Sequence, residues 1–189
     1  MKSFLIVSVL VAVGSLSLNA QEKVVLDTNP PPVAPKEEAI RTVNSAGVYY
    51  QTALDRTVAR NKAIPLFRDS SGWGHLTASF VTKGNGIGTP DVITLSLFIA
   101  SKDRTFVDNR SLSIKLDGKQ LIKGQTELAS GRTNGVEVYA SLRTMVSVEE
   151  FKSLAKAKQV VLSVGPREFE LTNQMTGGLR DLLSLIEDN

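Results

Sequence analysis

The sequence predicts an α+β fold, mostly antiparallel β with about seven to nine short strands and two C-terminal amphipathic helices. Three observations predict this class. Residues 92–99 alternate between two faces, one of them wholly aliphatic, as a strand does. The dipeptide Asp117-Gly118, which is favoured in type I′ hairpin turns, separates two apolar segments. Apolar residues over 173–186 recur at helical spacing, so they form one continuous face.

The N-terminal part of this region is the least regular. Residues 37–44 fit a short helix, because Ile40 and Val43 share a face and acidic residues occupy the first turn. Residues 48–54 and 57–59 alternate on either side of Asp55-Arg56, which predicts a hairpin. A helical spacing also fits 43–58, so both interpretations stay open there.

Three further segments follow in the middle of the chain. Residues 76–83 predict a strand with one apolar and one polar face. The glycine-rich residues 84–90 predict a flexible connection to the strand over 92–100, which is apolar enough to be central. Residues 112–116 and 119–122 then form a hairpin around Asp117-Gly118, and 136–142 alternate again as a strand.

The C-terminal part contains the two expected helices. Ser147 and Glu150 have the spacing of a capping box, so a helix should begin there and end near Lys158. Residues 160–164 and 168–171 flank a Gly-Pro-Arg turn and predict a compact hairpin, followed by a helix from about Asn173. A sandwich is the alternative architecture, and it depends on strand spacing alone.

Residues 1–20 have the pattern of a secretory signal peptide. Lys2 precedes an apolar run over 4–18, and Ala20 supplies a small residue at the cleavage point. Retention of this run as an anchor is the alternative. Residues 21–36 are rich in proline and predict an extended linker, which leaves 37–189 as a single globular β-rich domain. The expected location is therefore periplasmic or secreted.

Composition excludes several function classes. The chain has no cysteine, so a disulfide scaffold, a thiol nucleophile and a lipid-modified cysteine are excluded. The net charge is only +3 and both signs are interspersed, so we expect no nucleic-acid partner. No later segment has the length of a membrane span, so the mature chain should contain none.

We predict no catalytic, metal or cofactor-binding residues, because each candidate has a simpler structural role. His75 is the only histidine, which excludes multi-histidine metal sites. Ser153 and Lys156 match the spacing of serine–lysine acyl-transfer enzymes but lack the companion motifs. The loop carboxylates do not alternate as calcium ligands would, and they suit turns instead: Asp103, Asp108 and Asp117.

The sequence does suggest a binding surface. Exposed rings can stack on a ligand or anchor a partner, and a glycine-rich loop can close over it. The residues we select on this basis are Tyr49, Trp73, His75, Asn85 and Gly86. Tyr49 and Tyr50 alternate, so only one of them should face a given side.

We expect an exported, non-enzymatic domain of a bacterial protein that binds another secreted protein or a cell-envelope component. The sequence leaves its small-molecule ligand unspecified. The alternative is a small secreted hydrolase whose carboxylates converge only in the fold, for example on a glycan. A purely structural or chaperone-like envelope component is a third interpretation that sequence does not separate from the first.

Overall fold

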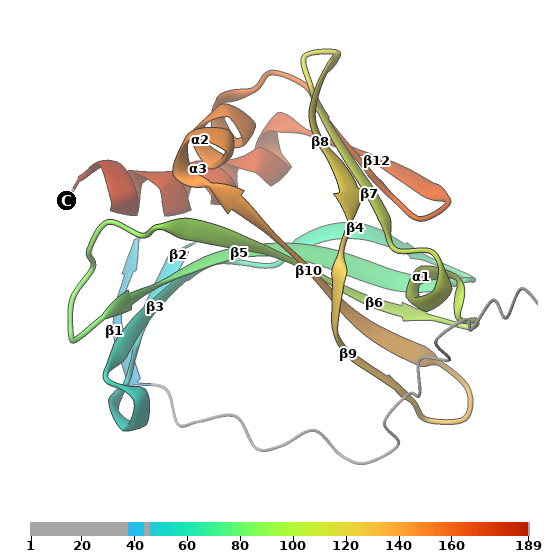
Figure 1. The fold of residues 1–189 in the computed structure, drawn as a ribbon, viewed down its shortest axis with the longest axis horizontal. Coiled ribbons are helices and arrows are strands. Elements are labelled where there is room, and N and C mark those ends of the chain that lie inside the picture. The colour runs from blue at the N-terminus through green and yellow to red at the C-terminus, as the bar shows by residue number, and fades with distance from the viewer. Residues whose placement is uncertain (1–37, 44–45, 189) are drawn as a thin grey trace, which may run out of the picture.

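The computed structural model describes residues 38–43 and 46–188. Within them the chain forms two antiparallel sheets and three α-helices, a mostly antiparallel α+β fold (Figure 1). The elements, in chain order, are β1 (Glu38–Val43), β2 (Ala46–Gln51), a 3₁₀ turn (Thr52–Leu54), β3 (Arg56–Asn61), β4 (Ile64–Asp69), β5 (Gly72–Lys83), β6 (Val92–Ser101), α1 (Thr105–Asp108), β7 (Ser111–Leu116), β8 (Lys119–Gln125), β9 (Glu127–Thr133), β10 (Val138–Ser147), α2 (Val148–Lys156), β11 (Val160–Val164), β12 (Arg167–Leu171) and α3 (Asn173–Glu187).

The larger sheet has eight strands and the smaller sheet has four. The larger one runs in the order β1-β2-β3-β5-β6-β10-β9, with β4 also paired to β5. The smaller one runs β12-β11-β7-β8. The chain passes from one to the other between β8 and β9, where buried Thr126 donates from its backbone N and its Oγ1 to the Arg110 carbonyl at 2.9 and 3.2 Å.

The predicted hairpins are confirmed. β7 and β8 pair around Asp117 and Gly118, whose φ angles of 48° and 78° are both positive, as a type I′ turn requires. β11 pairs with β12 and β2 pairs with β3, both antiparallel. The interpretation of 48–58 as strands rather than helix is therefore the correct one.

Two sequence predictions about the elements are wrong. Residues 38–43 form the edge strand β1 rather than a helix, because they pair with β2, and no local pattern reveals such a partner. The strands number twelve in the described ranges, more than the seven to nine expected. Residues 64–67, which extend the β pattern in the sequence, lie in β4, whereas β9 and the four-residue helix α1 have no counterpart among the predicted elements.

Both longer helices begin as the sequence predicts. The Ser147 Oγ accepts from the Glu150 backbone N at 3.2 Å, and the Glu150 carboxylate accepts in turn from the Ser147 N at 2.8 Å, which completes a capping box. Thr172 caps α3 by accepting from the Met175 N at 3.3 Å. The helices contact each other and lie on the inner face of the larger sheet.

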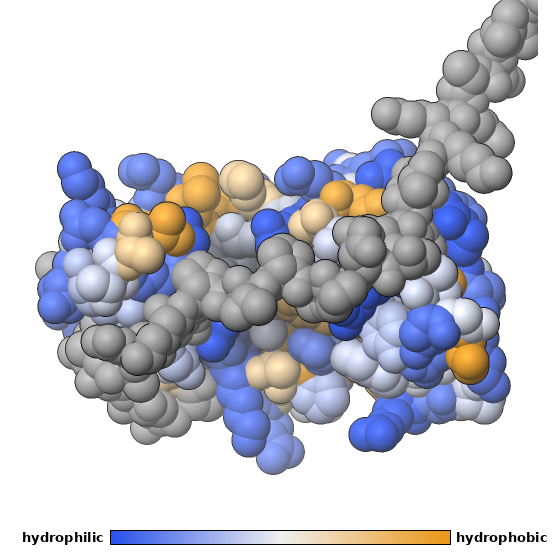
Figure 2. Space-filling view, turned by 90° about the horizontal axis from the view of Figure 1, so that it is seen from below, coloured by the Kyte–Doolittle hydropathy of each residue, from blue (hydrophilic) through white to orange (hydrophobic). Residues whose placement is uncertain are grey.

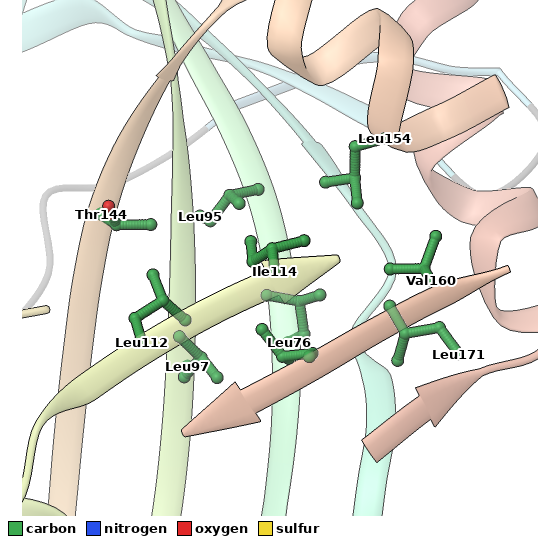
Figure 3. Close-up of a pocket in the computed structure, with 10 residues that line it drawn as sticks. Leu76, Leu95, Leu97, Leu112, Ile114, Thr144, Leu154, Val160 and Leu171 are labelled. Atoms are coloured by element: carbon green, nitrogen blue, oxygen red, sulfur yellow. The ribbon is translucent and has the colours of Figure 1, made fainter. Parts of the chain in front are cut away.

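The core lies between the inner face of the larger sheet, the smaller sheet and these two helices. In Figure 3 strands β7 and β11 cross over the larger sheet, and aliphatic side chains from both layers point toward one another. They leave a void of only about 10 Å³, roughly the space of one water molecule, so it is a packing defect rather than a ligand site. Its lining residues are Leu76, Leu95, Leu97, Leu112, Ile114, Thr144, Leu154, Val160, Leu162 and Leu171.

Strands β3 and β4 lie end to end along the same edge of β5, and a side chain fills the gap between them. β3 pairs with the C-terminal half of β5, and β4 pairs with its N-terminal half. In the gap, the buried Asn61 side chain accepts from the Ala78 backbone N at 2.6 Å and donates to the Lys62 carbonyl at 2.9 Å. This arrangement turns Lys62 and Ala63 outward at the middle of the sheet edge.

The predicted signal peptide, residues 1–20, and the linker, residues 21–36, lie outside the described residues. The single-domain assignment of 37–189 stays a prediction. Among the helices that the structure describes, none combines the length and the apolar character that crossing a membrane requires.

Candidate functional site

One face of the larger sheet is covered by no other element among the residues that the structure describes. Side chains alternate along its strands, so when Leu97 and Ile99 point into the core, Phe98 points to the opposite side. The described helices and the smaller sheet all lie on the core side (Figure 1). We call the opposite side, made by residues of β2, β3, β5, β6 and β10, the open face. Figure 2 views the molecule from this side and shows apolar residues among strongly hydrophilic ones.

The register of β5, β6 and β10 arranges the open face in rows, because paired residues project to the same side. One row contains Trp73, Ala100 and Tyr139, and the next contains His75, Phe98 and Ser141. The following rows are Thr77, Ser96 and Arg143, then Ser79, Thr94 and Met145. The open face is therefore aromatic toward one end and hydroxylated and cationic toward the middle.

A hollow of about 660 Å³ occupies the middle of the open face. This volume is in the range of small-molecule and peptide sites. Its floor carries hydroxyl groups and its walls carry rings and cations. The described residues that line it are Gly47, Tyr49, Val58, Arg60, Asn61, Lys62, Ala63, His75, Thr77, Ser79, Ser96, Phe98 and Arg143.

Three aromatic rings stack one on another at the aromatic end of the open face. Trp73 and His75 lie 5.5 Å apart between ring centroids with an interplanar angle of 4°, and His75 and Phe98 lie 5.1 Å apart at 23°. Because each ring covers a face of the next, His75 offers its edge to the hollow rather than its face. Burial lowers the pKa of His75 below its ordinary value of 6.5, so the imidazole is neutral at pH 7.

The opposite wall of the hollow presents a guanidinium on a tyrosine ring. The Arg60 guanidinium carbon lies 4.5 Å from the centroid of the Tyr49 ring, a cation–π arrangement. The ring lies across Gly47, where an added Cβ would come within 2.5 Å of the Tyr49 Oη. Because residue 47 is glycine, the Tyr49 ring can lie flat against β2, next to Arg60 at the wall of the hollow.

Two further cations line the hollow, Lys62 from the edge and Arg143 from β10. Among the described residues, neither side chain has a hydrogen-bond or ion-pair partner. None of the described lining residues is an aspartate or glutamate. Glu127 stands opposite Arg143 in the β9–β10 register and is the acidic residue paired with this row. Apart from Glu127 beside it, the described residues that line the hollow carry cations and no anions.

A second hollow, of about 420 Å³, adjoins the first around the sheet edge. Both are lined by Lys62 and Ala63, so this connection between β3 and β4 forms the lip that they share. The second hollow continues past Pro65 to Gln174 and Met175 in the first turn of α3. The two hollows together form a path from the open face to the N-terminal end of α3.

The structure brings together part of the predicted binding surface. Tyr49 and His75 line the same hollow, and Trp73 stacks against His75. Asn85 and Gly86 are not among its described lining residues, because they lie in the β5–β6 loop. That loop is tied back: Thr57 Oγ1 donates to the Gly84 carbonyl at 2.7 Å and accepts from the Gly86 N at 3.0 Å.

The lining residues that were not predicted from the sequence include the charged and aromatic ones Arg60, Lys62, Phe98 and Arg143. The available signal was the alternation of the strands, which places Phe98 opposite the aliphatic face of β6. The convergence of residues from β3, β6 and β10 depends on strand order, which local patterns do not contain.

The side chains weighed for catalysis have structural partners. Ser153 Oγ donates to the Glu149 carbonyl at 2.9 Å, and Lys156 Nζ pairs with the Glu187 carboxylate at 2.8 Å, so the two do not form a dyad. The Asp103 carboxylate accepts from the Thr105 N at 2.9 Å at the start of α1. In the part of the chain that the structure describes, no three acidic or histidine residues are grouped closely enough to hold a metal ion.

Comparison of the chain with protein-family models, with curated proteins and with solved structures found no match. Functional inference therefore starts from the geometry of the open face.

Proposed function

We propose that this chain is an exported, non-enzymatic domain that binds another secreted protein or a cell-envelope component through the open face of its larger sheet. The observation that carries the proposal is the hollow of about 660 Å³, in which rings, hydroxyls and cations from five strands converge. Convergence of this kind is typical of a ligand site, since packing alone does not require it.

The rival function, a hydrolase acting through paired carboxylates, has less support. Such an enzyme places two carboxyl groups on either side of the scissile bond, one of them with a raised pKa. The described residues lining the hollow include no carboxylate. The shifted carboxyl groups lie elsewhere, and their neighbours hold each pKa below its ordinary value: Asp69, Asp103 and Glu187.

The export part of the proposal is supported by residues 1–20, whose pattern is that of a cleavable leader, and by the proline-rich residues 21–36. We also propose that the two sheets form a sandwich-like pair, with α2 and α3 as amphipathic helices over the remainder of the larger sheet.

Steric blockage of the hollow tests this function. Thr77 is half-buried in the middle of the open face, so Thr77→Trp fills the hollow while every charge stays in place. The matched control is Val161→Trp, at a half-buried strand position on the outer side of the smaller sheet. Each purified protein is immobilised and incubated with cell-envelope extract and secreted proteins from the source organism.

The proposal predicts that wild type and Val161→Trp retain the same component, and that Thr77→Trp retains at least about tenfold less of it, as expected when a buried contact surface is obstructed. Equal retention by all three proteins would place binding elsewhere. Turnover of a glycan or peptide that Thr77→Trp abolishes would replace binding with catalysis.

A further inference from the structure

We infer that the open face binds an acidic, partly apolar peptide segment of a partner protein, lying extended along the two connected hollows. This inference rests on the proposed function and specifies the ligand class of the same site. Three features of the described residues carry it: the sign of the charge, the apolar side chains around the hollow and the shape of the path.

The charge selects an anionic ligand. Lys62 and Arg143 reach the hollow from the β3–β4 connection and from β10, and the described residues that line it include no carboxylate. Guanidinium groups bind carboxylates through paired, charge-assisted hydrogen bonds. The hydroxyls of the floor add donors that a carboxylate accepts.

Apolar side chains on the same face select a ligand that is more than an anion. Four of them are unusually exposed for their size, and alternation places all four on the open face. They are Val81 at 47%, Val92 at 44%, Phe98 at 37% and Met145 at 65%. A peptide offers apolar and acidic side chains together, whereas a polysaccharide offers no aliphatic side chains to cover these positions.

The arrangement of the rings also disfavours a sugar. Carbohydrates bind proteins by laying a ring against an exposed aromatic face. Here the central ring, His75, has Trp73 on one side and Phe98 on the other, at centroid distances of 5.5 and 5.1 Å. The three stacked rings therefore form an apolar wall, against which aliphatic or aromatic side chains of a peptide can pack.

The shape selects an extended chain. The hollow is concave, so a flat lipid surface does not reach its floor. The lip at Lys62 and Ala63 joins it to the second hollow, which leads to Met175 at the start of α3. A ligand that fills both hollows must pass over this lip. An extended peptide can cross the lip with its backbone and place side chains in the hollow on either side.

Selection from a random peptide library tests the inference even though the partner is unidentified. The library displays peptides about ten residues long, the length of a long strand. It is selected on the full wild-type chain and depleted on Lys62→Gln/Arg143→Gln, in which two cations of the hollow are neutralised. A second selection is depleted on Lys119→Gln/Lys123→Gln, which removes the same charge from exposed positions on β8.

The inference predicts that peptides surviving depletion on the hollow variant are enriched in Asp and Glu together with apolar residues. A synthetic member should lose about tenfold in affinity for the hollow variant, the size expected when charge-assisted hydrogen bonds are lost, and should bind the β8 variant as it binds wild type. Replacing its acidic residues with Gln and Asn should have the same effect as the hollow variant.

Two other anions are measured on the same proteins, namely polygalacturonate and vesicles containing phosphatidylglycerol. If either binds through Lys62 and Arg143 while no acidic peptide does, the ligand class is wrong but the open face still binds. If survivors show no acidic excess, or bind both charge variants alike, the inference also fails. If none of these ligands depends on the hollow, and Thr77→Trp has no effect on envelope binding, the proposed function fails with it.

Discussion

Asn61 closes the gap between β3 and β4, and replacing it tests how the fold places Lys62 at the lip of the hollow. Its Oδ1 accepts from the Ala78 backbone N at 2.6 Å, at the point where neither β3 nor β4 pairs with β5. Ala78 is completely buried and Asn61 is 3% exposed, so water does not replace this bond easily. Asn61→Ala therefore leaves a buried donor without its acceptor.

The magnitude follows from that desolvation. Leaving a buried backbone donor unpaired costs about 1–3 kcal/mol, and Asn61→Ala also removes the bond to the Lys62 carbonyl, so we expect the free energy of unfolding to fall by about 2 kcal/mol. For a chain of this size, about 2 kcal/mol lowers the melting temperature by roughly 4–8 °C. The measurement is urea unfolding followed by circular dichroism, with the midpoint shifted and the slope unchanged.

Asn85→Ala is the matched control, since it makes the same chemical change at an exposed loop position. We expect it to alter the free energy of unfolding by less than about 0.5 kcal/mol. The reasoning is refuted if Asn61→Ala costs no more than Asn85→Ala. It is refuted equally if the two losses are both large, because then the loop rather than the gap in the sheet limits stability.

Three further predictions concern the core and the contact between the sheets. Gly74→Ala should lower the free energy of unfolding in urea by about 1–3 kcal/mol, because the added Cβ would lie 2.5 Å from the Phe67 ring. Adding Phe67→Leu should restore part of this loss. If it restores none, the contact between these two residues is not the cause. Leu97→Ala, at a fully buried position beside the core void, should lose about 2–5 kcal/mol, and a loss below about 1 kcal/mol would mean that the layers are not packed there. Hydrogen bonds from Ser71 and Arg167 lower the pKa of Asp69 from 3.8 to about 2, so its ionised form stabilises the fold above pH 3.8, and this contribution is lost as the pH falls toward 2. The stability difference between wild type and Asp69→Asn should therefore shrink over that interval in unfolding curves at several pH values, and a constant difference would contradict the assignment.

Elements fixed by local chemistry are the ones that the sequence predicts. The β7–β8 turn needs two positive φ angles, and Asp117-Gly118 is among the few pairs that accept them. The start of α2 follows from a side-chain bond within three residues of Ser147. The helix prediction for 38–43 is wrong because an edge strand is defined by its partner, and the pairing with β2 leaves no trace in the spacing of apolar residues.

The site was predictable only in part for the same reason. Tyr49 was selected from the sequence because of its aromatic ring, and His75 because it is the only histidine. The strand order then brings both into one hollow. Arg143 had no local signal, because a cation on a strand is usually a solvated side chain. Its position in one row with Ser96 and Thr77 follows from β10 and β5 both pairing with β6, and this order is a property of the whole fold.

Photo-crosslinking from the open face tests the central claim most directly. Benzoylphenylalanine replaces Ser79, which lines the hollow, or Lys115, which is exposed on the outer side of β7. The full chain carrying each replacement is expressed in its source organism and irradiated. We predict a discrete adduct with one protein from position 79 and none from position 115. The same adduct from both positions, or an adduct from position 115 alone, would show that the partner does not bind the open face.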